Sequence, residues 1–273
     1  MNSCAPSSAP RPPAVAGMFY PDTPKVLKND ITALLDAVPP APTFPRPKAI
    51  IVPHAGYIYS GPIAASAYTR LAPYAADIHR VILLGPSHHV AVRGLAVPHA
   101  RSFATPLGNV PLDTDAIAAA LTLPQVIQHD AAHAQEHSLE VQLPFLQQVL
   151  GDFSLVPFSV GFATPDEVAE VLELLWGGPE TLIVISSDLS HYHSHADATR
   201  RDRHTADDIL HLRLLLDHEQ ACGATPINGL IKVAERRSLT PQLLDLRNSG
   251  DTAGDKTRVV GYASFAFMAP DHG

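Results

Sequence analysis

Short runs of consecutive apolar residues recur along the chain, separated by longer segments of mixed polarity. Runs of this length, bounded by turn residues, are typical of strands that are buried on both faces. They predict strands at residues 48–52, 81–84, 154–160, 181–186 and 259–268, with shorter strands at 94–97 and 243–246.

Between these runs, apolar residues recur at helical spacing. The periodicity predicts helices at residues 25–37, 63–71, 113–121, 138–150, 165–175, 203–218 and 225–234. Pro62 suits the first turn of its helix, and Asp113 or Thr114 suits a cap. Ser138 is expected to cap the helix that follows it. Residues 102–108 are expected to form a loop.

Helices that alternate with apolar strands predict an α/β fold, with a central, mostly parallel sheet flanked by helices. Neither a shift in composition nor an internal repeat interrupts residues 14–268, so they are expected to form a single domain. Residues 1–13 are rich in Pro, Ser and Ala and are expected to be a disordered tail. Residues 269–273 are expected to be a C-terminal tail.

Histidines follow three of the apolar strands directly. His54 comes after the strand at 48–52, His88 and His89 come after 81–84, and His191 comes after 181–186. In an open α/β sheet, ligands bind in the crevice outside the carboxyl ends of the strands. These loops are therefore expected to converge on one site.

The chemistry of these loops suits a metal ion, because neutral imidazole is a common ligand for zinc, iron and copper. His54 and His88 are the first two candidate ligands, since adjacent strand ends would bring their ring nitrogens together. A third ligand is needed, and spacing alone leaves it open. The candidates are Glu136, Glu140, Asp188, His191 and Cys222.

Other interpretations of these residues compete with a metal site. The histidines are alternatively surface or hydrogen-bonded loop residues. Ser87 with His88, or Ser190 with His191, would serve as nucleophile and base, although sequence neighbours rarely have that geometry and no Gly-x-Ser-x-Gly elbow is present. Zinc hydrolysis, with His191 or Glu136 acting on a metal-bound water, is a further alternative.

Cys222 lies just before a predicted helix start, a position that lowers a thiol pKa and suits a metal ligand or a nucleophile. An inert buried cysteine is the competing interpretation. Three tyrosines near the loops are candidates for lining the pocket, or else for packing. They are Tyr57, Tyr59 and Tyr192.

Composition and charge argue against several classes of protein. The net charge of -8 and the lack of a Lys or Arg run argue against nucleic acid or an anionic membrane as a partner. No apolar stretch approaches the roughly 20 residues of a membrane span, and no signal peptide is expected. Cys4 and Cys222 are the two cysteines, so a disulfide framework is not expected and a cytoplasmic location fits. The fifteen histidines are the main anomaly.

Five ordered motifs, taken together, resemble the Memo family, including the Memo-like proteins called AmmeMemoRadiSam system protein B. They are PHAGY at 53–57, LGPSHH at 84–89, EHSLE at 136–140, SSDLSH at 186–191 and CG at 222–223. The lead-in AGMFYP at 16–21 and the ending GYAS at 261–264 fit as well. The resemblance implies the fold of class III extradiol dioxygenases, with a non-haem metal at one end of the sheet.

The resemblance also implies site residues, carried over by motif. His54, His88 and Cys222 match the family's metal ligands. Asp188 and His191 match residues that line the same pocket. His137 belongs to that pocket too, and His89, beside a ligand position, is a weaker candidate.

Where the extradiol enzymes use two histidines and a carboxylate on Fe(II), this chain has a cysteine as the third ligand. A thiolate favours copper or zinc more than a carboxylate does, and it is oxidisable. We therefore expect a metal-binding redox protein, an oxidoreductase of the dioxygenase-like class with Fe(II), or copper or zinc, as cofactor and an unnamed small-molecule substrate. His191 and His137 would transfer protons, and Asp188 would orient one of them or the metal-bound water. The alternative is a non-catalytic module that binds a small molecule or peptide.

Overall fold

The computed structural model describes residues 9–40, 44–215 and 217–270. Residues 1–8 and 271–273 of the two expected tails lie outside this part. Arg11, which the sequence assigned to the tail, is 6% exposed and donates from Nε to the carbonyl of His133 at 2.9 Å. The packed part of the chain therefore begins before residue 14.

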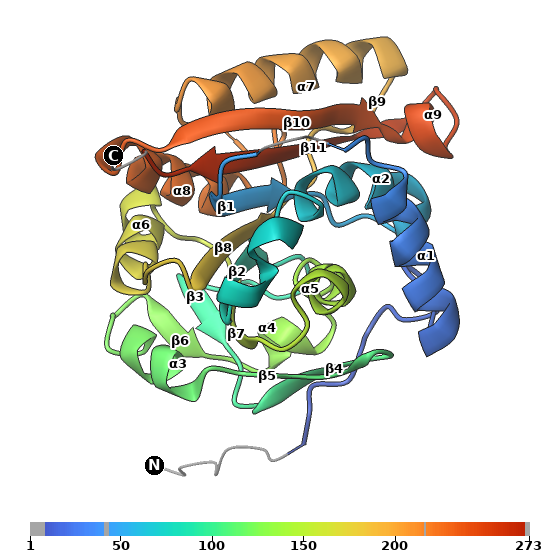
Figure 1. The fold of residues 1–273 in the computed structure, drawn as a ribbon. Coiled ribbons are helices and arrows are strands. Elements are labelled where there is room, and N and C mark those ends of the chain that lie inside the picture. Colours follow the sequence, from blue (N-terminus) through green and yellow to red (C-terminus); the bar gives the residue numbers. More distant parts are fainter. Residues whose placement is uncertain (1–8, 41–43, 216, 271–273) are drawn as a thin grey trace.

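A sheet of nine strands crosses the described part of the molecule in the order β10-β11-β1-β8-β2-β7-β3-β6, with β9 paired to β11 (Figure 1). The strands are β1 (Pro47–Val52), β2 (Arg80–Pro86), β3 (Leu95–Val97), β6 (Val126–Gln128), β7 (Ser154–Val160), β8 (Thr181–Ser186), β9 (His191–His193), β10 (Thr240–Asn248) and β11 (Val259–Met268). The central strands β1, β8, β2 and β7 run parallel to one another. Antiparallel pairs lie on either side, β1 with β11 and β7 with β3.

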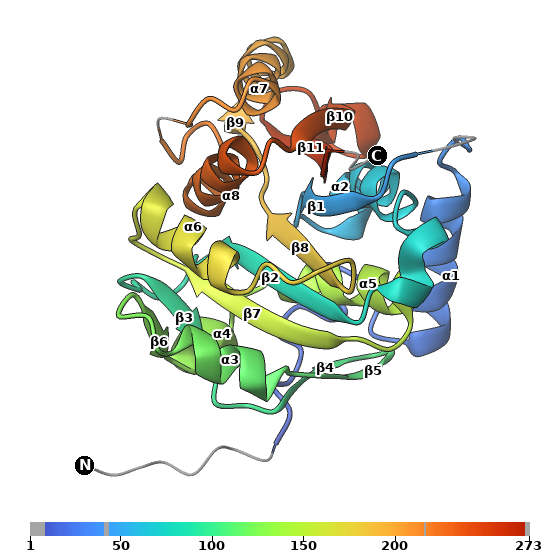
Figure 2. The same ribbon diagram turned by 60° about the vertical axis from the view of Figure 1, so that its left-hand side comes forward.

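Helices cover both faces of this sheet, as Figure 2 shows. On one side lie α1 (Pro24–Asp36), α2 (Tyr57–Tyr68) and α5 (Leu143–Leu150), and on the other lie α6 (Pro165–Leu174), α7 (His195–Leu210) and α8 (Ala224–Arg236). Shorter helices complete the described fold: α3 (Thr114–Ala120), α4 (Ala131–Ala134), α9 (Ser249–Thr252), and the 3-10 helices η1 (Ala72–Asp77) and η2 (Glu140–Gln142). The expected single α/β domain with a mostly parallel sheet is confirmed.

The apolar runs form the core because both faces of the central strands are covered. Ile50, Leu83, Val156 and Ile183, one from each central strand, are all 0% exposed. A parallel sheet buried in this way has its strand ends and their loops as the places where polar side chains gather. This arrangement decides where the histidines lie.

Two expected elements are wrong. Residues 102–108 do not form a loop but most of a hairpin, β4 (Ser102–Thr105) with β5 (Gly108–Pro111), which turns at the positive φ of Gly108. The helix expected at 203–218 starts earlier, at His195, because the side chain of Ser194 caps it by accepting from the Asp197 amide. It ends at Leu210, two residues before Leu212 takes a left-handed φ of 53°.

Two helix starts also differ from expectation. Pro62 lies inside α2, because the helix already begins at Tyr57, directly after the first histidine loop. Ser138 does not cap a helix: its hydroxyl donates to the carbonyl of Pro86 at 2.9 Å, and a 3-10 turn precedes α5. By contrast, Asp113 caps α3 as one of the two expected candidates, accepting from the Ala116 amide.

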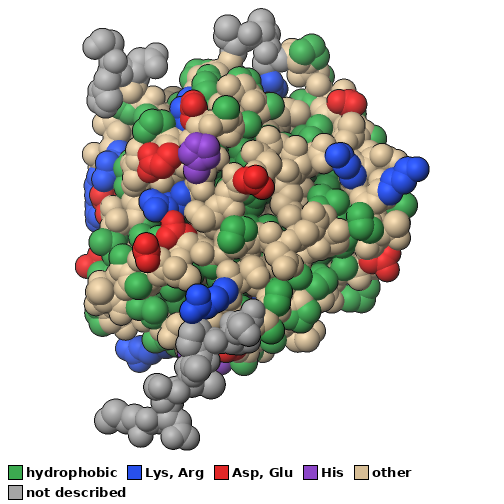
Figure 3. Space-filling model, turned by 60° about the horizontal axis from the view of Figure 1, so that its bottom comes forward, with side chains coloured by type: hydrophobic (Ala, Val, Ile, Leu, Met, Phe, Trp, Pro, Cys, Tyr) green, Lys and Arg blue, Asp and Glu red, His purple; other side chains and the backbone are tan. Residues whose placement is uncertain are grey.

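Charged side chains are interspersed on the face shown in Figure 3, where Lys and Arg side chains stand apart from one another with Asp and Glu among them. The absence of a nucleic-acid partner stays a prediction. Among the described residues, we find no helix of sufficient length and apolar character to cross a membrane.

Candidate metal centre

The three histidine-bearing loops leave the sheet from neighbouring parallel strands. β8 lies between β1 and β2, with Val52 opposite Ser186 and Leu84 opposite Ile185. The chain therefore turns out of the sheet at the same edge three times, and His54 and His88 each follow their strand by two residues. The structure brings these two histidines together, with ring centroids 5.2 Å apart.

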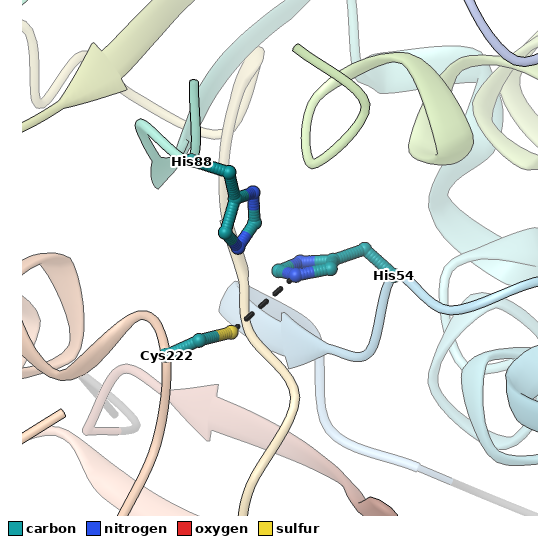
Figure 4. Close-up of side chains that lie close together, drawn as sticks. All are labelled: His54, His88 and Cys222. Atoms are coloured by element: carbon teal, nitrogen blue, oxygen red, sulfur yellow. Dashed lines mark hydrogen bonds between the residues drawn. The ribbon is translucent and has the colours of Figure 1, made fainter. Parts of the chain in front are cut away.

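Cys222 completes the cluster from the segment before α8. One nitrogen from each of His54 and His88 and the sulfur of Cys222 lie within 4.8 Å of one another (Figure 4). The Nε2 atom of His54 is 3.4 Å from Sγ. Bond lengths to zinc of about 2.0 Å for nitrogen and 2.3 Å for sulfur place two ligands of a tetrahedral site about 3.5 Å apart. The donor set and its spacing therefore fit a first-row transition metal.

Glu136 orients His88. Its carboxylate accepts from the His88 amide at 2.6 Å and lies 2.8 Å from the Nδ1 atom of the same residue. Burial alone would raise the pKa of Glu136, but the bonds from His88 and from the Ser138 amide outweigh it and lower that pKa to about 2. An ionised carboxylate only accepts, so Nδ1 of His88 is the donor, which leaves Nε2 as the ring nitrogen that could bind a metal.

His54 is the most deeply buried member of the cluster, at 2% exposed. Its amide donates to Asp188 Oδ1 at 2.8 Å, and its Nδ1 atom lies 2.9 Å from the hydroxyl of Ser186. Desolvation, reinforced by the nearby His88, lowers the pKa of His54 to about 3. The ring is therefore neutral at pH 7, the form in which imidazole binds a metal.

Cys222 is held by backbone contacts with Asp188: its amide donates to the Asp188 carbonyl at 3.2 Å, and its sulfur accepts from the Asp188 amide at 3.3 Å. A Cβ at Gly223 would lie 2.7 Å from Ser187, so only glycine allows the two loops this approach. The expected lowering of the thiol pKa is wrong for the protein alone, because burial and the Asp188 charge raise it. A bound cation reverses that balance and deprotonates a coordinating thiol.

A cavity of about 480 Å³ lies beside the cluster, and several other residues that the sequence singled out line its wall. His137, Asp188 and His191 all line it, as do Tyr59 and Tyr192. Tyr57, by contrast, is buried, and its hydroxyl donates to the carbonyl of Val141 at 2.8 Å.

The ring of His137 stacks on that of His88, with centroids 4.7 Å apart and planes 13° from parallel. Desolvation, then the proximity of His54, lowers the pKa of His137 to about 4. Desolvation by burial raises the pKa of Asp188 above its usual value. The cavity thus has a neutral imidazole and a buried carboxyl on its wall.

Several other sequence candidates lie elsewhere or have other partners. Glu140 does not face the cluster, because its carboxylate accepts from Arg11, the Tyr20 hydroxyl and two backbone amides. Ser87 donates to the carbonyl of Val90 at 2.6 Å instead of pairing with a histidine. The buried hydroxyl of Ser190 makes no hydrogen bond to His191.

Sequence reasoning missed two roles that the structure makes plain. Glu136 was considered as a ligand, whereas it binds the far side of the His88 ring. Ser186, the last residue of an apolar strand, was not considered, although it contacts His54. A small polar residue ending a buried strand, beside a histidine loop, was the available signal.

Comparison with known proteins agrees with this architecture. The family model described as Memo-like protein matches residues 11–266. A MEMO1 family protein from Sulfolobus acidocaldarius is 38% identical, covering 94% of this chain and 99% of its own. One from Aquifex aeolicus is 36% identical, with 94% and 99% covered. An uncharacterized protein from Escherichia coli K12, 13% identical with a TM-score of 0.53 over 81% of this chain and 99% of its own, shares the fold. The chain belongs to the Memo-like protein family.

Proposed function

We propose that this protein is a metal-dependent redox protein, a non-haem iron oxidoreductase in which His54, His88 and Cys222 hold one Fe(II) ion. The observation that carries the proposal is the convergence of two imidazole nitrogens and one thiol sulfur within 4.8 Å of one another. Among these three residues the one hydrogen bond joins Cys222 Sγ and His54 Nε2 at 3.4 Å, and both atoms are of types that bind transition metals. Copper and zinc suit the same donors.

The number of protein ligands favours catalysis over a structural role. Closed structural sites have four protein ligands, whereas catalytic sites keep a position open. The proposed site has three, and the adjoining cavity of about 480 Å³ leaves room for a small molecule beside it. A bound iron ion would supply electron-transfer and dioxygen chemistry at that position.

The proposal assigns proton transfer to residues on the cavity wall. His137 stacks on the ring of His88 and is neutral near pH 7, so it can accept a proton. His191 lines the same cavity from β9, beside Asp188. We assign Asp188 an orienting role because its carboxylate accepts from the amide of His54, next to the proposed metal.

Metal analysis after anaerobic purification tests the ligand assignment. We expect about one iron per chain in the wild type and little in Cys222→Ser, because a hydroxyl is a far weaker ligand than a thiolate. His99→Ala is the matched control, since His99 pairs with the exposed Asp130 at 3.1 Å and should leave the iron content unchanged. Equal iron in wild type and Cys222→Ser would refute the site.

Oxygen uptake tests the redox activity. With the metal restored, catechols or small reductants should cause uptake by the wild type. His191→Ala should keep its iron but lower the rate by about 100-fold or more, the usual contribution of a general acid–base residue. An iron-loaded wild type without uptake under any of these reductants would reject the oxidoreductase.

A second function, a non-catalytic binding module, is favoured by the rim of the same cavity. Met18, Ile58, Tyr59 and Tyr192 are large apolar side chains exposed by 72%, 69%, 38% and 64%, and all of them line it. Exposed apolar side chains gathered around a pocket are typical of a binding surface. A protein with iron content unaffected by Cys222→Ser and without oxygen uptake would support this module.

A further inference from the structure

Ser186 lies at the centre of a buried hydrogen-bond network behind His54. The network joins Tyr68, Gln142, Ser186 and His54, of which the first three are 0% exposed and His54 is 2% exposed. The hydroxyl of Ser186 has three partners: the carbonyl of Ser138 at 2.6 Å, the Nε2 atom of Gln142 at 2.8 Å and the Nδ1 atom of His54 at 2.9 Å. The hydrogens available to these groups determine which atom donates in each bond.

The amide of Gln142 has a fixed orientation. One of its two side-chain atoms lies 2.9 Å from the carbonyl of Pro53, which only accepts, so that atom is the nitrogen Nε2. The other atom, Oε1, accepts from the hydroxyl of Tyr68 at 2.8 Å. Gln142 therefore presents a donor to Ser186.

The hydroxyl of Ser186 has a single hydrogen, and the carbonyl of Ser138 takes it because a carbonyl cannot donate. One lone pair of Ser186 accepts from Gln142. The remaining lone pair can only accept, so Nδ1 of His54 is the protonated nitrogen. The Nε2 atom then carries the lone pair, and it is the atom that lies 3.4 Å from Cys222 Sγ.

We infer that Ser186 is a positioning residue that sets the protonated nitrogen of His54 and so keeps Nε2 available as a ligand. If Ser186 donated to Nδ1 instead, the buried carbonyl of Ser138 would lose the hydroxyl that binds it, at a cost that disfavours this state. Ser186 thus acts on His54 as Glu136 acts on His88, except that the acceptor is a neutral hydroxyl instead of a carboxylate. The expected change in metal affinity rests on the proposed function, whereas the expected position of the His54 ring proton does not.

Nitrogen NMR of the metal-free wild type, labelled with ¹⁵N-histidine, tests the inference directly. The His54 signals are those that disappear in His54→Ala. We expect Nδ1 to be protonated and Nε2 to be bare at pH 7. A ring protonated on Nε2 would overturn the inference, whatever the fate of the metal site.

Two variants separate the effect of Ser186 from general damage to the network. Ser186→Ala removes the acceptor of Nδ1–H, so the proton should move to Nε2 and Co²⁺ affinity should fall about 10- to 100-fold. Gln142→Met removes a bond to the same hydroxyl but leaves its acceptor for His54, so the tautomer should persist and affinity should change by less than about 3-fold. Equal Co²⁺ affinities in wild type and Ser186→Ala, with the same tautomer, would refute the role of Ser186.

Chelator competition, followed by the sulfur-to-cobalt absorption band, measures these affinities. A wild type that binds no Co²⁺ would reject the metal site itself, and the NMR result would still decide the tautomer. The two failures are therefore distinguishable.

Discussion

Two polar clusters lie close together in this protein, one buried and the other partly exposed at His88 and Cys222, and their members satisfy one another to different degrees. The strap cluster consists of Glu140 and the N-terminal residues that it binds, Arg11 and Tyr20, together with the amides of Ala14 and Val15. The metal cluster consists of His54, His88 and Cys222. In the strap cluster both oxygens of a buried carboxylate accept from donors, whereas in the metal cluster the one hydrogen bond among the three residues joins Cys222 Sγ and His54 Nε2 at 3.4 Å.

The difference separates residues that hold the fold from residues suited to chemistry. Glu140 is 0% exposed, and its two oxygens accept four bonds, so its charge is compensated within the protein. The metal cluster has a single internal hydrogen bond, and its nitrogen and sulfur atoms suit a cation as well. Polar groups that do little to satisfy one another are expected at functional sites.

The largest effect should come from breaking the metal cluster. His54→Ala removes one of three ligands and should abolish Fe(II) or Co²⁺ binding, because two remaining ligands make a weak site. Metal titration of the purified variant measures this. Full occupancy in His54→Ala would show that the metal is held elsewhere.

Breaking the strap cluster should lower stability without removing the metal ligands. Glu140→Gln leaves the guanidinium of Arg11 buried without its charged partner, which should cost about 3–5 kcal/mol of the free energy of unfolding. Urea denaturation measures the loss. Asp77→Asn is the matched control, since Asp77 pairs with Arg46 at 3.0 Å while 63% exposed, and it should cost no more than about 1 kcal/mol. Similar losses in both variants would contradict this account.

Acid should weaken the region beside the strap through His133, whose carbonyl accepts from Arg11. Desolvation lowers the pKa of this buried ring from 6.5 to about 4, so the unfolded chain takes up a proton first as pH falls. Its contribution is therefore complete above about pH 6.5 and is lost toward pH 4, by about 2 kcal/mol between pH 7 and pH 5. Urea midpoints of the metal-free protein should fall over that range, and less steeply in His133→Gln. Urea midpoints that fall equally with pH in the wild type and in His133→Gln would contradict this role of His133.

The smallest effect should come from His89, beside the metal cluster but outside it. Its side chain is exposed, and its ring centroid lies 6.5 Å from that of His88. His89→Ala should change Co²⁺ affinity by less than about 3-fold, since no ligand or ligand partner is lost. A larger loss in the chelator competition would extend the cluster to this residue.

Much of the fold was predictable because the apolar runs are strong local signals. The runs at 81–84, 154–160 and 181–186 became β2, β7 and β8, buried on both faces. The misplaced helix at 195–210 shows the limit, because its start depends on the Ser194 cap and its end on a left-handed residue. Single residues decide where such a helix begins and ends, whereas the hydrophobic periodicity reports only the average pattern over many residues.

The sequence by itself determined that histidines follow the buried strands, since the order of apolar runs and polar loops lies in the chain. Only the tertiary structure decided which side chains meet. It placed β8 between β1 and β2, so that Cys222, beside the Asp188 loop, reached the two histidines. It also turned Glu140 toward Arg11 and Glu136 toward His88. The physical reason is that partners far apart in the chain are chosen by packing and by the pairing of buried polar groups, which no local pattern records.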